Sequence, residues 1–176
     1  MKPFDWLIRG GRVVDPANGL DAELDVALSG GKVATVEKDL DPEAAQHTFD
    51  ARGKIVTPGL VDLHTHTYDL VTPLGIDADH YCLGRGVTTC VDTGSAGSDT
   101  FPGFRRFSAE RFRTRVLGFL NISRAGLAVG GATDKGAPGE LESPKFINAD
   151  ECVACIEANR DLLVGVPVKL GAKGIE

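Results

Sequence analysis

Thr57-Pro-Gly-Leu-Val-Asp-Leu-His-Thr-His66 is the stretch that decides the fold and the chemistry of this chain of 176 residues. Its Pro-Gly turn leads into the apolar run Leu60–His64, which predicts a β-strand that ends in two histidines. Residues two apart in a strand point to the same face, so His64 and His66 can aim two imidazoles at one point. Neutral imidazole is a good ligand for zinc and similar divalent metals. The pair is therefore a candidate metal site.

The position of the pair in the chain decides whether His64 and His66 are interpreted as metal ligands or as two surface histidines. Two surface histidines would give the same His-x-His pattern. Here the pair ends the first strand of a strand–helix series, and barrel enzymes build their active sites at that end of their strands. Asp62, two residues before His64, has the same facing and is able to orient His64 by accepting a hydrogen bond from its imidazole; the alternative, which we favour, is a plain loop carboxylate. His47 and His80 are predicted to be surface or packing residues.

The residues before the quoted stretch predict a small β module over residues 1–56. Leu24–Leu28 and Lys32–Val36 alternate between apolar and polar side chains on either side of Gly30-Gly31, which predicts a hairpin. The other short β-rich runs are Trp6–Arg9, Gly11–Val14, His47–Asp50 and Lys54–Val56.

Residues 57–176 change to a rhythm of strand and helix, which predicts parallel βα units with right-handed crossovers. Four such units make half of an eight-stranded barrel, and a small open sheet is the alternative. Because the sequence ends just after the fourth strand, we expect an N-terminal part of a longer fold. The predicted strands are Leu60–His64, Val87–Val91, Arg115–Asn121 and Val164–Leu170. The predicted helices run from an Asp77 cap to Leu83, from Pro102 to Phe112, and from an Asp150 cap to Leu162.

The composition narrows the classes of partner. A net charge of -6 argues against nucleic acid or an anionic membrane and leaves a small molecule as the expected partner. No apolar stretch is long enough to span a bilayer, and the N-terminus lacks the apolar core of a secretory signal, so we expect a cytoplasmic protein. The Cys152-Val-Ala-Cys155 motif is either a redox or half-zinc site or, as we favour, two small residues on one helical face.

The quoted stretch also carries a family resemblance. The run Asp50–His66 resembles the junction of the amidohydrolase superfamily, where a Pro-Gly turn feeds a first barrel strand that ends in His-x-His. Leu7–Pro16 resembles the opening strands of the same enzymes. Gly86–Gly97 is similar to the second barrel strand and its loop in the dihydroorotase-like deacetylase branch. The resemblance implies an α/β protein with an N-terminal small β-sandwich module (1–56), followed by the first half of a (β/α)8 metal-dependent hydrolase barrel (57–176).

The function implied by this resemblance is hydrolysis of an amide or ester of a small carboxylate substrate by a metal-activated water. His64 and His66 would hold a divalent metal, with zinc expected and one or two metals per site in the complete enzyme. The general base and the remaining histidine ligands are expected beyond residue 176. This chain alone is therefore expected to be inactive. The alternative is a truncated, catalytically incompetent chain that acts as a binding or interaction protein, and homo-oligomers through open strand edges are possible.

The predicted fourth strand departs from the family pattern. In the deacetylase branch a carboxylated lysine that bridges two metals follows a glycine and one apolar residue, but here Gly165-Val166 is followed by Pro167. Lys169 stands two residues after Pro167, the position of the family's lysine, and its side chain points to the same face of the strand. It is displaced from that position by about 6–7 Å along the strand. Either Lys169 is the bridging ligand through a local shift or the bridge is missing.

Two further residues are candidates for substrate binding. Ser95 lies in Gly94–Gly97, a turn after Asp92 that could present backbone N–H groups to a substrate carboxylate or oxyanion. Arg124 could pair with a substrate carboxylate. The alternative for Ser95 is that Gly94–Gly97 is an ordinary turn with no substrate contact. The alternative for Arg124 is an arginine exposed on the surface.

Overall fold

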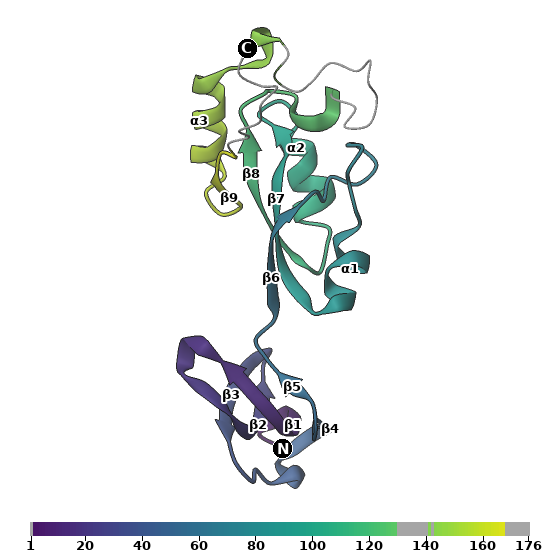
Figure 1. Cartoon of the computed structure of the whole chain (residues 1–176), viewed down its shortest axis with the longest axis vertical. Coiled ribbons are helices and arrows are strands. Elements are labelled where there is room, and N and C mark those ends of the chain that lie inside the picture. Colours follow the sequence, from purple (N-terminus) through teal and green to yellow (C-terminus); the bar gives the residue numbers. More distant parts are fainter. Residues whose placement is uncertain (1, 130–140, 142, 168–176) are drawn as a thin grey trace. The chain divides into compact units, whose positions relative to one another are not determined.

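The computed structural model describes residues 2–129, 141 and 143–167 of the chain. The chain divides into two compact units, Met1–Pro58 and Gly59–Glu176 (Figure 1). Each unit is built around its own sheet.

The first unit contains one mixed sheet with the strand order β3-β2-β1-β4, and β5 also pairs with β1. The predicted hairpin is confirmed: β2 and β3 are antiparallel, and their last pair, Ser29 with Lys32, encloses Gly30 and Gly31. Both glycines have positive φ (58° and 73°), as a two-residue hairpin turn requires. The strands are β1 (Phe4–Asp15), β2 (Leu20–Ser29), β3 (Lys32–Glu37), β4 (Ala45–Asp50) and β5 (Ile55–Val56).

The long strand β1 replaces the two short runs predicted between Trp6 and Val14. Its pairing with β2 shifts register between Ile8 and Gly11, which marks a bulge at Gly10, whose φ is 66°. The Asp25 carboxylate accepts a hydrogen bond from the Gly10 N–H at 2.7 Å. The bulge therefore joins the two runs into one strand instead of separating them.

The β-sandwich predicted for residues 1–56 is not confirmed. One face of the sheet packs Leu7 and Ala27 against Leu40. On the other face Trp6 and Phe49 line a shallow depression, and their side chains remain 45% and 49% exposed. A sandwich needs a second sheet against such a face. The described residues of this unit form a single sheet.

The second unit contains a four-stranded sheet in the order β6-β7-β8-β9, with every neighbouring pair parallel. Helices alternate with these strands, which confirms the βα rhythm of the sequence. Residues 168–170 of the predicted fourth strand lie outside the described residues. The elements are β6 (Leu60–Thr65), α1 (Ala78–Tyr81), β7 (Val87–Gly97), α2 (Phe101–Phe104) with a π-helical turn (Arg105–Ala109), β8 (Arg115–Asn121), α3 (Ala149–Ala158) and β9 (Leu163–Gly165).

The cap of α3 differs from the prediction. Asn148, not Asp150, is the N-cap residue: its backbone is extended, and its side chain accepts a hydrogen bond from the Glu151 N–H at 3.1 Å. Asp150 lies in the first turn, where a negative charge still interacts favourably with the helix dipole. Both residue types suit a cap, so composition alone does not separate them.

The core of the second unit lies between the sheet and its helices. Phe104 and Leu120 are among its buried side chains. Cys152 is buried there and Cys155 packs against the same cluster, so the Cys-x-x-C motif is one apolar face of α3. Among the described residues, no helix has the length and apolar character needed to cross a membrane.

The Cys90 thiol in this core is expected to resist alkylation in the native protein. Burial raises the pKa of Cys90 to about 12, so at pH 8 only about one molecule in ten thousand carries the reactive thiolate. We expect iodoacetamide to modify the half-buried Cys155 before Cys90, as measured by peptide mass spectrometry. In urea all cysteines should react at similar rates. Labelling of Cys90 before Cys155 in native protein would contradict the burial argument.

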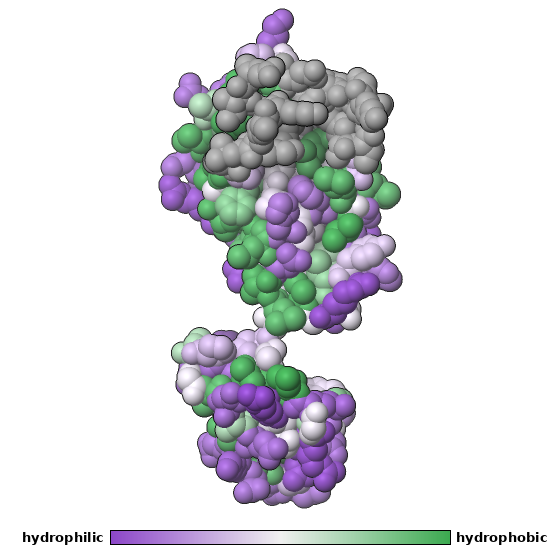
Figure 2. Space-filling view, viewed as in Figure 1, coloured by the Kyte–Doolittle hydropathy of each residue, from purple (hydrophilic) through white to green (hydrophobic). Residues whose placement is uncertain are grey.

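Strand β6 forms one edge of the second sheet and carries exposed apolar side chains. Leu60, Val61 and Leu63 are 52–69% exposed, and Figure 2 shows apolar surface gathered around the start of this strand. An unpaired apolar edge favours association with another chain segment.

Candidate metal centre

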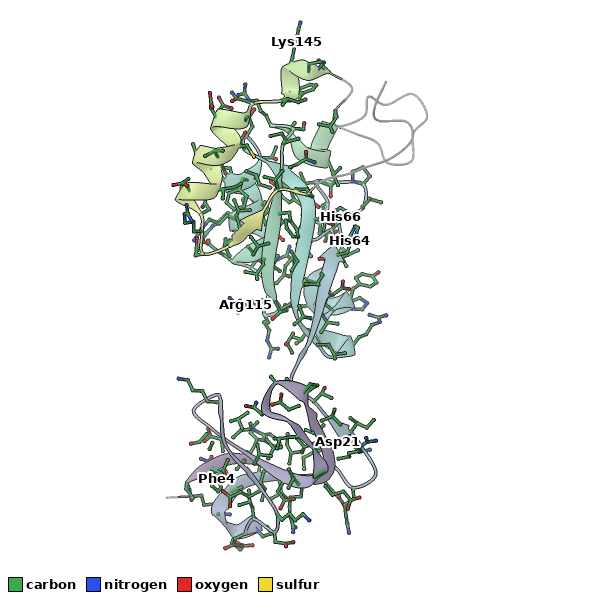
Figure 3. The ribbon with its side chains drawn as sticks, turned by 60° about the vertical axis from the view of Figure 1, so that its left-hand side comes forward. Phe4, Asp21, His64, His66, Arg115 and Lys145 are labelled. Atoms are coloured by element: carbon green, nitrogen blue, oxygen red, sulfur yellow. The ribbon has the colours of Figure 1, made fainter. Side chains whose placement is uncertain are left out.

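His64 and His66 lie together at the C-terminal end of β6. His64 belongs to the strand and His66 follows one residue after its end. Their ring centroids are 5.7 Å apart with the planes at 75°. Figure 3 shows both side chains at the same end of the sheet, whereas Arg115, at the start of β8, marks the opposite end. The structure thus brings the two predicted ligands to the edge where parallel sheets place active sites.

The ring of His66 contacts a side chain of the next strand. Its Nδ1 lies 3.0 Å from Oγ of Ser95 in β7. Ser95 is completely buried, and its backbone N–H donates to Oδ1 of Asp92 at 2.7 Å. A substrate contact of Ser95 stays a prediction, but its hydroxyl is engaged with the candidate metal ligand.

Asp92 is the buried carboxylate of this region, with 1% of its surface exposed. It lies in the middle of β7, which extends to Gly97, whereas the predicted strand stopped at Val91, just before Asp92. Its Oδ2 accepts from the Thr67 N–H at 2.6 Å. Burial raises the pKa of Asp92, and the hydrogen bonds from Thr67 and Ser95, together with the nearby His66, oppose that rise. The contact with Thr67 was not foreseen, because nothing in the sequence marks Thr67 except that it follows His66.

The backbone of Gly94–Gly97 is less available to a substrate than predicted. The Ser95 N–H is donated to Asp92, and the Gly97 N–H is donated to Oγ1 of Thr100 at 3.1 Å. Both N–H groups are therefore used in hydrogen bonds within the protein. For these two groups, the alternative of an ordinary turn explains the sequence.

Asp62 contacts the backbone of His64 and not its ring. Its Oδ1 accepts from the His64 N–H at 3.0 Å, and the side chain is exposed. This is a local turn-like contact, which short carboxylate side chains readily form with the N–H two residues later, and it agrees with the loop-carboxylate alternative.

Arg124 is engaged by two carboxylates of other parts of the chain. The Arg124 guanidinium forms ion pairs with Asp99 at 3.1 Å and with Glu151 at 3.0 Å. A substrate carboxylate would have to compete with both. Lys169 lies outside the described residues.

Comparisons with known proteins agree with this geometry. No protein-family model matches the sequence. A deacetylase of Agrobacterium fabrum is 36% identical over 146 residues, which are 82% of this chain and 35% of that protein. A crystal structure of a dihydroorotase matches with a TM-score of 0.80 and 33% identity, covering 92% of this chain and 41% of that one. The structure of an adenine deaminase matches with a TM-score of 0.75 and 26% identity, covering 93% and 40%.

This chain belongs to the amidohydrolase superfamily. It resembles the dihydroorotases and deacetylases, and its relatives are hydrolases that act on C–N bonds. The chain spans about a third of the length of the deacetylases it matches (35% and 36%). Its mixed and parallel sheets form an α/β fold that resembles the amidohydrolase barrel.

The amidohydrolase relationship implies a metal, and the donor set of this chain fits one in part. His64 and His66 supply two imidazoles of the kind that zinc prefers, whereas a tight zinc site has three or four protein ligands. In residues 2–129, 141 and 143–167, no group of three or more His, Cys, Asp or Glu side chains comes together to hold an ion. The described residues therefore fit a partial metal centre.

Proposed function

We propose that this chain contributes the first part of the active site of a metal-dependent amidohydrolase that cleaves an amide or ester of a small carboxylate substrate. The observation that carries the proposal is the meeting of His64 and His66 at the C-terminal end of β6, with ring centroids 5.7 Å apart. The relatives named deacetylase and dihydroorotase support the class of reaction.

In this proposal the two imidazoles hold a divalent metal, zinc by preference, with one or two metals in the complete site. When bound, such a metal supplies the Lewis acidity that activates water and polarises a carbonyl group. Lys169 stays a candidate ligand. We place the general base and the remaining ligands outside the described residues. The four parallel strands are, on this view, the first half of a (β/α)8 barrel, and residues 1–56 are part of a β-sandwich that needs further strands.

Partners and location complete the proposal. We expect a small-molecule substrate in the cytoplasm and neither nucleic acid nor membrane as a partner. The exposed apolar side chains of β6 favour self-association of the 176-residue chain through this edge.

The proposal is tested by hydrolysis assays on the protein made from its natural gene. We expect zinc-dependent release of acetate from a panel of N-acetylated amino acids and acetate esters, lost on chelation and restored by zinc. The 176-residue chain alone should release none, because two ligands do not hold zinc tightly. Turnover that chelators leave unchanged would contradict the metal mechanism, and a zinc-loaded natural protein that is inactive on the whole panel would sink the proposal.

A further inference from the structure

The backbone directly after His66 is held by three other segments of the chain. The Thr67 N–H donates to Oδ2 of Asp92 at 2.6 Å, and the Thr67 carbonyl accepts the Ser108 hydroxyl at 2.8 Å. The His66 carbonyl, which belongs to the same peptide group as the Thr67 N–H, accepts the Ile76 N–H at 2.8 Å. Two consecutive peptide groups after His66 therefore have fixed partners.

Thr65, the buried residue before His66, is held as well. Its hydroxyl donates to the Val91 carbonyl at 2.9 Å, and its carbonyl accepts the Thr93 hydroxyl at 3.1 Å. Both partners belong to β7. The chain on both sides of His66 is thus fixed to the neighbouring strand, and Ser108 also fixes it to the helices that cover the sheet.

Ser108 reaches Thr67 from a helical turn of unusual geometry. In the π-helical turn Arg105–Ala109, the Glu110 N–H donates to the Arg105 carbonyl five residues earlier at 2.9 Å, whereas an α-helix joins residues four apart. Such wide turns are rare and often occur at functional sites. The turn carries Ser108 to the buried side of the helix, against the end of β6.

The polarity of this turn is the reverse of the usual pattern. Ser108 is completely buried, whereas its neighbour Phe107 remains 65% exposed. Burying a phenylalanine stabilises a fold more than burying a serine, whose hydroxyl costs free energy unless it is hydrogen-bonded. Exceptions to this rule are expected at functional or strained sites. The hydrogen bond of Ser108, and not its packing, therefore explains why a serine occupies the position.

We propose that Ser108 is a positioning residue of the histidine pair, and that its hydroxyl couples the helical turn to the end of β6. Because a side chain turns about its own backbone, loss of this contact leaves the His66 ring less closely placed. The consequence for metal binding rests on the proposed function, since His66 is a ligand only in that proposal. Removing a group that supports a ligand in this indirect way typically lowers metal affinity by about 10- to 100-fold.

The test compares Ser108→Ala with the parent in the protein made from its natural gene. In the metal-free protein we expect hydrogen exchange at the Thr67 and Ile76 amides to become about 10-fold faster, because a buried hydrogen bond beside them is lost. Mass spectrometry of the corresponding peptides measures this change. Zinc affinity, measured by competition with a chelator, should fall about 10-fold or more.

Thr114→Val is the matched control, since it also removes one buried hydroxyl that contacts a backbone carbonyl. The Thr114 hydroxyl oxygen lies 3.2 Å from the Ala78 carbonyl oxygen and 2.9 Å from Oδ1 of Asp79. Both partners belong to α1 and not to the end of β6. We expect this variant to lose a similar amount of stability and to exchange faster around α1. Its zinc affinity and the exchange of the amides beside His66 should not change.

Three results would overturn the inference. Two concern folded Ser108→Ala: unchanged exchange at Thr67 and Ile76, or unchanged zinc affinity despite faster exchange. The third is an equal loss of zinc affinity in Ser108→Ala and Thr114→Val, which would assign the effect to general stability. A natural protein that shows the expected exchange pattern and binds no zinc would instead refute the proposed function and leave the anchoring by Ser108 standing.

Discussion

Replacing Gly97 with alanine is expected to destabilise the second unit by about 3 kcal/mol, the upper end of the usual cost of overpacking. A Cβ atom at this position would lie 1.8 Å from the Ser123 carbonyl oxygen and 2.5 Å from the Arg124 carbonyl carbon. Both contacts are with backbone atoms, so no side chain can rotate away to relieve them. Gly97 also pairs with Asn121 across β7 and β8, and the two strands would have to separate where they now pair.

The measurement is thermal unfolding of the second unit, with an expected fall of roughly 10 °C in its melting temperature. Gly118→Ala is the matched control in the neighbouring strand β8. Its Cβ would make only ordinary contacts, 3.6 Å from Phe104 and 3.7 Å from Leu163, and we expect a change below about 1 kcal/mol. A Gly97→Ala protein that melts within 2 °C of the parent would show that the two strands separate more easily than their contact implies.

The features predicted correctly from the sequence are those whose signals are local. The hairpin followed from alternation on either side of Gly30-Gly31, and β6 followed from the apolar run that ends at His64. The meeting of His64 and His66 needed only the two-residue repeat of a strand. Nothing distant in the chain is required to set any of these features.

The features that were missed depend on partners far away in the chain. The Asp92 carboxylate contacts Thr67 across 25 residues, and that contact exists only because β6 and β7 pair with Thr65 opposite Asp92. A sequence shows that an aspartate lies in an apolar strand but not which N–H groups will surround it. The ion pairs of Arg124 have the same origin, since Asp99 lies in the turn after β7 and Glu151 lies in α3.

The sandwich prediction is not confirmed, for another physical reason. Alternating strands predict that one or both faces of a sheet are apolar, and they do not supply the layer that covers each face. In the first unit Leu7 faces a packed side, whereas Trp6 and Phe49 face an uncovered one. The sequence indicates that this apolar face must be buried by a second layer, and the described residues do not form that layer.

Removing the histidine pair is expected to abolish specific zinc binding by this chain. In calorimetric titrations at pH 7.5, the parent should bind zinc weakly, and the double variant His64→Ala/His66→Ala should bind at least about 100-fold more weakly, a loss of about 2.8 kcal/mol. Each single variant should already lose most of this affinity, because one imidazole alone cannot chelate an ion. The two losses should therefore not add, as is usual for residues that act on one ligand.

The two remaining histidines of the chain supply the controls. His47 stacks on Trp6 in the first unit and His80 packs against Tyr81 in α1, each with ring centroids 4.8 Å apart. His47→Ala and His80→Ala should leave zinc affinity unchanged, because neither ring contacts the pair. If these variants weaken binding as much as His66→Ala does, zinc binds to scattered surface histidines. Equal affinity in the parent and the double variant would remove the geometric basis of the metal centre, since its two donors would then contribute nothing.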